Sequence, residues 1–502
     1  MRKSATLIFI LRVIRLVVAV VNLSLAARYF GVNFERDVWL LALTCVIVID
    51  TVLWGAINDT FRAKFIFLKS EEGEAAATER ANSLLLFTHL VSIALVIAVV
   101  LFPKIIAQVI APAYKDAQLT SLVLMIRIVA PSFLLTQIVK LLASILNAYG
   151  SFIIPEVLGF FTQLFTLVIV VLFADAIGIY TLAISYYVGL ILLLILLLYQ
   201  LKRRGVKLHL KLSSVRLQNF RPFLLFSFPF FFIYLSSQLN IVIERGLASS
   251  VAVGSVSVLD YSRKFSDIPL EVLVGIITSL LIPVLTRSYS KHDHRLFIEE
   301  FRKIYQFGLL VLIFIAGMFT ACPEAIVRLL YQKGEMSQSI LQDISRLTMY
   351  YSWSAVAVFM YQIFGSALIS AQNGLRFAFL GTFAQLIMIV INLGLYDRFS
   401  FYLFPFSLFI SHALVALIMA LQFPVPARRL LPISVSYISV MIISCAIAWS
   451  LNYFLFTGFH IVLRIVLTAL VLVLVTGGAI FSFKLEERTV ILNLLKRALP
   501  EK

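Results

Sequence analysis

The chain has 502 residues, of which 61% are hydrophobic and only 13% are charged, and its mean hydropathy is +1.01. Soluble globular chains carry about twice that share of charge, so the composition excludes a cytosolic globular enzyme, a disordered chain and a disulfide scaffold. Lys and Arg number 42 against 25 Asp and Glu, a formal net charge of +17. We attribute much of this excess to cytoplasmic loops of a membrane protein and not to nucleic-acid binding.

Apolar runs that are long enough to span a lipid bilayer, about 20 residues each, recur along the whole chain. The expected spans, about fourteen by this criterion, are 5–30, 37–59, 82–102, 120–147, 153–174, 177–201, 222–249, 255–286, 304–322, 340–371, 376–397, 400–422, 432–456 and 460–482. The sequence therefore predicts an all-α polytopic membrane protein.

Basic residues are concentrated in the loops on one side of the predicted membrane. Segment 202–221 carries seven Lys and Arg residues and no acid, and the loops near 62–80 and 287–303 carry four and five Lys and Arg residues. The opposite loops hold few Lys or Arg residues. Because cytoplasmic loops collect these residues, we expect both termini to lie in the cytoplasm.

Two short polar joints, 147–151 and 370–374, lie six predicted spans apart and indicate a weak internal repeat. Transporters are often built from two such halves, with the binding site between them. The predicted domains are a six-helix lobe, a basic cytoplasmic linker, a second six-helix lobe, two further spans and an amphipathic cytoplasmic tail, at 1–201, 202–221, 222–422, 423–483 and 484–502.

Ionisable residues inside apolar spans mark the candidate site, because each costs about 2.5–3.5 kcal/mol at the bilayer centre. We expect a cationic, substrate-binding cavity formed by Arg12, Arg15, Arg28, Arg263 and Lys264. The acids and ion-pair partners expected around this cavity are Asp37, Asp50, Glu244, Arg245, Asp260 and Asp267.

Alternative interpretations stay open for some of these charges. Glu244 and Arg245 are equally well explained as an ion pair that locks helices together. For Arg127 and Lys140 a structural role is favoured, since both side chains are long enough to reach toward a membrane interface. Asp260, Lys264 and Asp267 recur at helical spacing, which places them on one face of the eighth span.

The chain lacks the motifs of a soluble active site. It has no Gly-rich phosphate loop, no Ser-His-Asp grouping and no zinc-ligand spacing, so we expect neither enzyme activity nor a metal or cofactor. Cys45, Cys322 and Cys445 are far apart in or beside apolar segments, which indicates plain apolar packing.

Four stretches, in this order along the chain, resemble the MurJ/MviN lipid II flippases of the multidrug/oligosaccharidyl-lipid/polysaccharide (MOP) exporter superfamily. They are Ala-Arg-Tyr-Phe-Gly at 27–31 with Asp37 after it, Leu-Asn through Phe-Ile-Ile-Pro at 146–155, Gly-Ser-Val-Ser-Val-Leu-Asp-Tyr-Ser-Arg-Lys-Phe-Ser-Asp-Ile-Pro-Leu at 254–270, and Val-Arg-Leu-Leu-Tyr-Gln-Lys-Gly at 327–334. The resemblance spans at least residues 12–375.

The resemblance implies a V-shaped, two-lobed transporter that flips an undecaprenyl-diphosphate-linked glycan across the bacterial inner membrane by alternating access. In this family the glycan is the peptidoglycan precursor lipid II, which is needed for the cell wall and cell shape. Asp37 matches the family's functional aspartate. This sequence departs from the family near Leu16, at Asp50 and at Lys264, where the family has arginines.

The partners expected from the resemblance are the lipid-linked glycan and membrane lipids, with no nucleic acid. We expect a monomer that works beside the cell-wall or polysaccharide synthesis machinery, coupled to the membrane potential or to a monovalent ion. The main alternative is a flippase for a capsule, exopolysaccharide or other lipid-linked oligosaccharide. A cation or drug antiporter would need an acid-dominated cavity, and a membrane transferase would need a large extracytoplasmic loop with acid and base groups.

Overall fold

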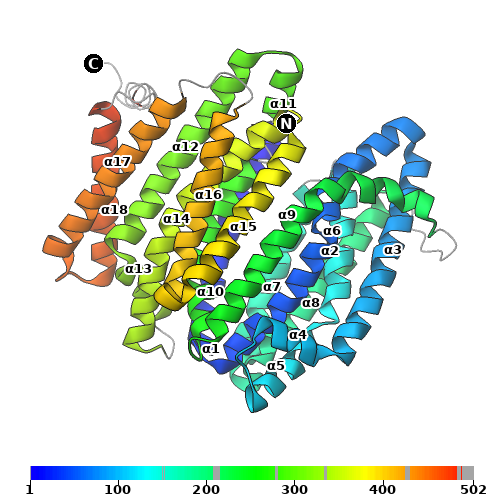
Figure 1. The fold of residues 1–502 in the computed structure, drawn as a ribbon, viewed down its shortest axis with the longest axis horizontal. Coiled ribbons are helices and arrows are strands. Elements are labelled where there is room, and N and C mark those ends of the chain that lie inside the picture. The colour runs from blue at the N-terminus through cyan, green and yellow to red at the C-terminus, as the bar shows by residue number, and fades with distance from the viewer. Residues whose placement is uncertain are drawn as a thin grey trace. The chain divides into compact units, whose positions relative to one another are not determined.

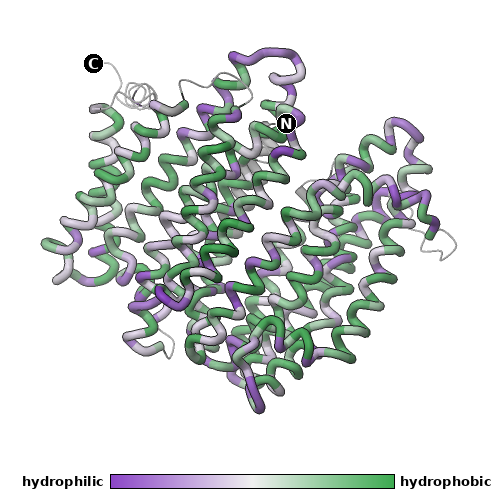
Figure 2. The backbone as a smooth tube through the Cα atoms, in the orientation of Figure 1, coloured by the Kyte–Doolittle hydropathy of each residue, from purple (hydrophilic) through white to green (hydrophobic). Residues whose placement is uncertain are grey.

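A computed structural model describes residues 2–149, 151, 153–206, 215–277, 281–332, 336–423, 430–482 and 488. Over these residues the chain is helical, without a β-strand (Figure 1). Hydrophobic residues run along the helices, and hydrophilic residues gather at helix ends and connections (Figure 2). The prediction of an all-α polytopic membrane protein is confirmed.

The longer helices reproduce most of the predicted apolar runs. In chain order the helices are α1 (Arg2–Phe30), α2 (Phe34–Glu72), α3 (Glu74–Leu101), α4 (Pro103–Ile110), α5 (Asp116–Val129), α6 (Ser132–Ala148), α7 (Ile153–Ile177), α8 (Tyr180–Arg203), α9 (Leu217–Ser249), α10 (Ser255–Ile276), α11 (Ile282–Ser290), α12 (His294–Ala321), α13 (Pro323–Tyr331), α14 (Gln338–Ser370), α15 (Gly374–Phe399), α16 (Leu403–Leu421), α17 (Leu430–Leu451) and α18 (Ile461–Ser482). Two short turns, η3 (Ser400–Tyr402) and η4 (Asn452–Phe456), lie between helices.

Ten helices in the described ranges are long and apolar enough to cross a membrane, or up to eleven if the bent pair α5–α6 is one span. The predicted count of fourteen stays a prediction. The single span expected over 120–147 is two helices bent by 40°. The bend coincides with Pro131, which lacks the backbone N–H that would continue the helix.

Two short helices, α4 and α13, were not expected from the sequence. Each begins with a proline, a residue well accommodated in the first turn of a helix. Each follows a residue with similar backbone angles, Phe102 at φ −119°, ψ 42° and Cys322 at φ −138°, ψ 50°. The long helices α3 and α12 thus end in the same way, which supports the internal repeat.

The chain divides into two compact units. The first comprises Met1–Asp260 and Leu375–Ser407, and in it α2 packs against α3, α5, α6 and α9. The second comprises Tyr261–Gly374 and Leu408–Lys502, and in it α12 packs against α14, α17 and α18. In the first unit α9 packs with α2, and the lobes expected at 1–201 and 222–422 stay predictions.

The remaining domain boundaries stay predictions. Most of the basic linker lies in the described ranges, but its residues 207–214 do not. The predicted amphipathic tail from 484 also lies outside the described residues, apart from Arg488.

Aromatic packing fills the centre of the second unit. The Phe301 ring lies 4.8 Å from the Phe423 ring and 5.5 Å from the Phe364 ring, measured between centroids. Phe359 is fully buried against α12, where Gly308 makes room for it. A Cβ atom at Gly308 would lie 2.0 Å from Cζ of Phe359, so this close approach of α12 and α14 requires glycine.

We expect Gly308→Ala to lower the stability of the second unit by about 1–3 kcal/mol, the usual effect of overpacking a core. The matched control is Gly159→Ala in α7, where an added Cβ meets nothing within 4 Å and the substitution should be neutral or stabilise slightly. Thermal unfolding of both variants in detergent micelles checks this. Equal melting temperatures would contradict the packing argument.

Candidate functional site

The N-terminus of α10 is capped by a side chain from α2. Asp37 is fully buried, and its Oδ2 accepts a hydrogen bond from the Gly254 N–H at 2.7 Å. Its Oδ1 accepts from the Ser257 N–H at 2.7 Å and from the Ser257 hydroxyl at 2.5 Å. The first backbone donors of a helix have no partner within it, so Asp37 supplies the capping that α10 otherwise lacks.

Local structure places Asp37 at this position. Asn33 caps α2 by accepting a hydrogen bond from the Arg36 N–H at 2.9 Å, which sets Asp37 in the first turn of α2. Gly254 has φ +92°, a conformation that favours glycine, and a Cβ there would lie 2.6 Å from Cγ1 of Val32. Burial, and then the negative charge of Asp37, raises the pKa of the nearby Tyr114, which therefore stays protonated.

A buried charge cluster continues from this cap along the first turns of α10. The carboxylate of Asp260 lies 3.6 Å from Arg36 Nη2 and 3.5 Å from Arg245 Nη2. Arg245 Nη1 also donates to the Val256 carbonyl at 3.1 Å. Helices α2, α9 and α10 are thus joined by charge pairs, and Glu244 is buried beside Arg245 on α9.

Deeper in α2, two more acids have partners on neighbouring helices. The Lys140 ammonium on α6 forms an ion pair and hydrogen bond with Oδ2 of Asp50. The Tyr234 hydroxyl on α9 donates to Oδ2 of Asp59. Helix α2 therefore carries a row of acidic side chains that are bonded to α6 and α9.

The predicted cavity cations are distributed over both units. Arg12 and Arg15 lie in α1, and their side chains are outside the described part. Arg28 is exposed in the last turn of α1, in the first unit. Arg263 and Lys264 lie in the second unit, where Arg263 Nε is 3.4 Å from Asp267 Oδ2. That these cations form one cavity stays a prediction.

The predicted acids differ in their surroundings. Asp37, Asp50 and Asp260 are buried and hold helices together, whereas Asp267 is partly exposed on α10. Arg245 forms an ion pair with Asp260, a partner that was not expected from the sequence. These buried acids contact protein donors, so their role in the structure is to hold cations and helix ends in place.

Sequence reasoning missed Arg36, and it interpreted Lys140 as a side chain that extends toward an interface. The signal for Arg36 was its place beside Asp37 in the first turn of a span. Lys140 is bonded to Asp50 instead, since a buried carboxylate is strongly stabilised by an opposite charge.

A further missed cluster joins α17 and α18 in the second unit. Arg464 is the only Lys, Arg, Asp or Glu between 430 and 482. Its Nε donates to Asn452 Oδ1 at 2.8 Å, and Asn452 Nδ2 donates to the Thr468 hydroxyl at 2.7 Å. Asn452 begins the π-helical turn η4, a widening of the helix that often accompanies a special side-chain contact.

Comparison with known proteins identifies the family of this chain and two relatives of part of it. The sequence model of the family described as lipid II flippase MurJ matches residues 26–469. Two proteins described as probable lipid II flippase MurJ, from Helicobacter pylori strains J99 and 26695, are 28% identical over 104 residues, or 20% of this chain. The chain covers only 22% of the length of each in that alignment.

Solved structures show the same fold. A structure described as lipid II flippase MurJ in an inward closed conformation matches with a TM-score of 0.79 at 19% identity, over 97% of this chain and 100% of that one. An inward-facing multidrug-resistance MATE transporter of the MOP superfamily matches with a TM-score of 0.65 at 13% identity, over 82% and 97%. The predicted MOP fold is confirmed.

We expect Asp37→Ala to destabilise the first unit by several kcal/mol, because each buried donor left unsatisfied costs about 1–3 kcal/mol. Its neighbour Glu35 is exposed in the same turn, so Glu35→Ala is the matched control and should change stability little. Hydrogen exchange reports the cap directly. The amides of Gly254 and Ser257 should exchange faster in Asp37→Ala alone, and unchanged rates there would refute the capping role.

Removing Asp260 leaves two arginines near each other without their shared acid. We expect Asp260→Ala to cost about 3–5 kcal/mol, as for other broken buried ion pairs. Asp267→Ala, which removes the partly exposed partner of Arg263, should cost about 1 kcal/mol or less. Urea or thermal unfolding of the two variants gives the comparison, and equal effects would show that the Asp260 cluster is not a stabilising pair.

Proposed function

The chain belongs to the lipid II flippase MurJ family, and from that premise we propose that it moves lipid II from the cytoplasmic to the outer leaflet of the bacterial inner membrane. The observation that carries the proposal is the match of the family model over residues 26–469. It covers both compact units and the spans that hold the buried charges.

The energetic problem for such a protein is the polar part of the substrate. Lipid II carries a diphosphate and a glycan, which lipid does not solvate, and a long apolar tail, which can stay in the bilayer. Cations within membrane-spanning helices are costly unless they face water or an anion. Arg28 and Lys140 in the first unit, and Arg263 and Lys264 in the second, are such cations with partly or fully exposed side chains. Cations of this kind are the groups that would bind the diphosphate.

Alternating access would carry the headgroup across, and the membrane potential supports the direction of movement. With the cell interior negative, outward movement of an anion is favoured by about 2.3 kcal/mol per charge per 100 mV. We therefore propose coupling to the potential, without ATP and without a chemical reaction of the substrate. The family is one of transporters, and the role of this chain would be binding and reorientation.

The proposed orientation puts both termini in the cytoplasm. The connection between α2 and α3 has Lys69 and Arg80 beside it, and the connection between α11 and α12 has Arg287, Lys291 and Arg295 in or beside it. The positive-inside rule assigns such connections to the cytoplasmic face. We further propose that the protein acts as a monomer beside the enzymes that make and use the cell-wall precursor.

The test is rescue of bacterial cells depleted of their own lipid II flippase. We expect the wild-type chain to restore growth, and Lys264→Glu and Arg15→Glu to abolish rescue at equal protein levels, since each replaces an anion-binding cation with an acid. Arg295→Glu is the control, because that side chain is 90% exposed at the start of α12, and it should rescue fully.

Two outcomes would change the proposal. Rescue by Lys264→Glu and Arg15→Glu would refute the cationic passage. Failure of the wild-type chain to rescue, together with restored export in a strain that lacks a capsule or exopolysaccharide flippase, would move the substrate to another lipid-linked glycan.

A further inference from the structure

The ion pair between Asp50 and Lys140 is unusually asymmetric. The Asp50 side chain is 1% exposed, whereas the Lys140 side chain is 44% exposed. Only Oδ2 of Asp50 is bonded to the ammonium, and Oδ1 has no hydrogen-bond partner among the described residues. A buried acid thus depends on a cation that is itself accessible from outside the protein.

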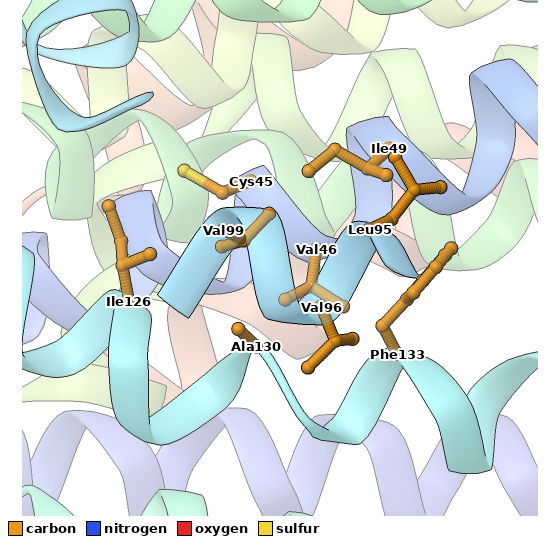
Figure 3. A pocket seen from close by; sticks show the side chains of 9 residues that line it. All are labelled: Cys45, Val46, Ile49, Leu95, Val96, Val99, Ile126, Ala130 and Phe133. Atoms are coloured by element: carbon orange, nitrogen blue, oxygen red, sulfur yellow. The ribbon is translucent and has the colours of Figure 1, made fainter. Parts of the chain in front are cut away.

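Asp50 itself does not line the small apolar hollow that lies beside it on α2. Beside Ile49, the contact of α2 with α3 and the α5–α6 bend is lined entirely by apolar side chains, those of Cys45, Val46, Ile49, Leu95, Val96, Val99, Ile126, Ala130 and Phe133 (Figure 3). Asp50 is buried, and a buried ionised carboxylate is strongly disfavoured unless a cation or several donors accompany it. The charge of Asp50 therefore depends on Lys140.

The other titratable groups near this pair do not replace Lys140. Tyr186 on α8 faces Asp50, and its hydroxyl is bonded to Thr136 at 3.3 Å. Asp59, farther along α2, faces the same Lys140 and accepts a hydrogen bond from Tyr234 on α9. On α5, Arg127 is exposed and donates to the Val100 carbonyl at 3.4 Å. Lys140 is therefore ion-paired with Asp50 and acts on Asp59 through its charge alone.

We propose that binding of an anionic lipid diphosphate to Lys140 is coupled to uptake of a proton by Asp50. This inference rests on the proposed function, since it takes the substrate headgroup as the anion. When the diphosphate binds the exposed ammonium of Lys140, its negative charge comes close to the negative charge of Asp50. Asp50 also shares or loses the ammonium as its partner. Both changes favour the protonated, neutral carboxyl of Asp50 over the carboxylate. A proton from solvent then adds to Asp50, while Lys140 keeps its own proton and stays charged.

The coupling has a definite sign. Because the complex holds one proton more than the separate partners, the affinity for the diphosphate falls as the pH rises, by up to about tenfold per pH unit. Asp50→Asn cannot take up the proton but keeps an amide oxygen that can accept from Lys140. In that variant binding should persist and should lose most of its pH dependence.

The experiment is isothermal titration of the full-length protein in detergent with undecaprenyl diphosphate, at neutral pH in two buffers of different ionisation enthalpy. The difference in heat between the buffers gives the protons taken up per ligand bound. We expect about one proton for the wild type and close to none for Asp50→Asn. Glu74→Gln is the matched control, since Glu74 pairs with Lys69 on the exposed surface, and it should behave as the wild type.

The outcomes separate this inference from the function on which it rests. Binding without proton uptake, or equal uptake by the wild type and Asp50→Asn, overturns the coupling and leaves the proposed function standing. If undecaprenyl diphosphate and lipid II both fail to bind, the proposed function fails and the coupling fails with it. Titration with inorganic diphosphate is a further arm: the same proton uptake is expected at weaker affinity, and equal affinity would show that the site recognises a free anion and not a lipid.

Discussion

The packing of the first unit depends on one set of hydrogen bonds. A buried carboxylate needs hydrogen-bond donors, and the buried N-terminus of a helix needs acceptors. Asp37 on α2 and the first turn of α10 meet both needs at once, through three hydrogen bonds between residues more than 200 positions apart in the chain. Both groups are buried in the protein, where they need protein partners. The approach of α10 to α2, and the pairing of Arg36 and Arg245 with Asp260 beyond it, depend on this contact.

The helical class and most spans were predictable because a bilayer demands long apolar runs, and such runs are visible in the sequence. The breaks were harder to place. The prolines at 103, 131 and 323 stand in apolar surroundings where either a kinked span or a helix end was compatible with the sequence. Whether a proline bends or ends a helix depends on what packs against it, as the bend between α5 and α6 shows.

Most ionisable residues inside the spans were also identified from the sequence, since each is costly in lipid, but Asp59 and Arg464 were missed. The partners of these residues were not identified. The pairing of Asp50 with Lys140 joins two helices whose adjacency the sequence does not state, and Arg36 was overlooked because it lies at a predicted span end. The neighbouring helices determine whether a charged side chain is buried or exposed. Buried charged residues hold the structure together, and exposed ones are available to a ligand.

The bond between Arg464 and Asn452 bears on how the protein enters the membrane during synthesis. An arginine in an otherwise uncharged pair of helices opposes insertion of α18 on its own. Its partner Asn452 lies only twelve residues earlier, in the π-helical turn η4 that follows α17. The bond can therefore form as soon as both segments have left the ribosome. Helices α17 and α18 are therefore suited to enter the bilayer together as a hairpin. The hydrogen bond between Arg464 and Asn452 would then form before α12 packs against them.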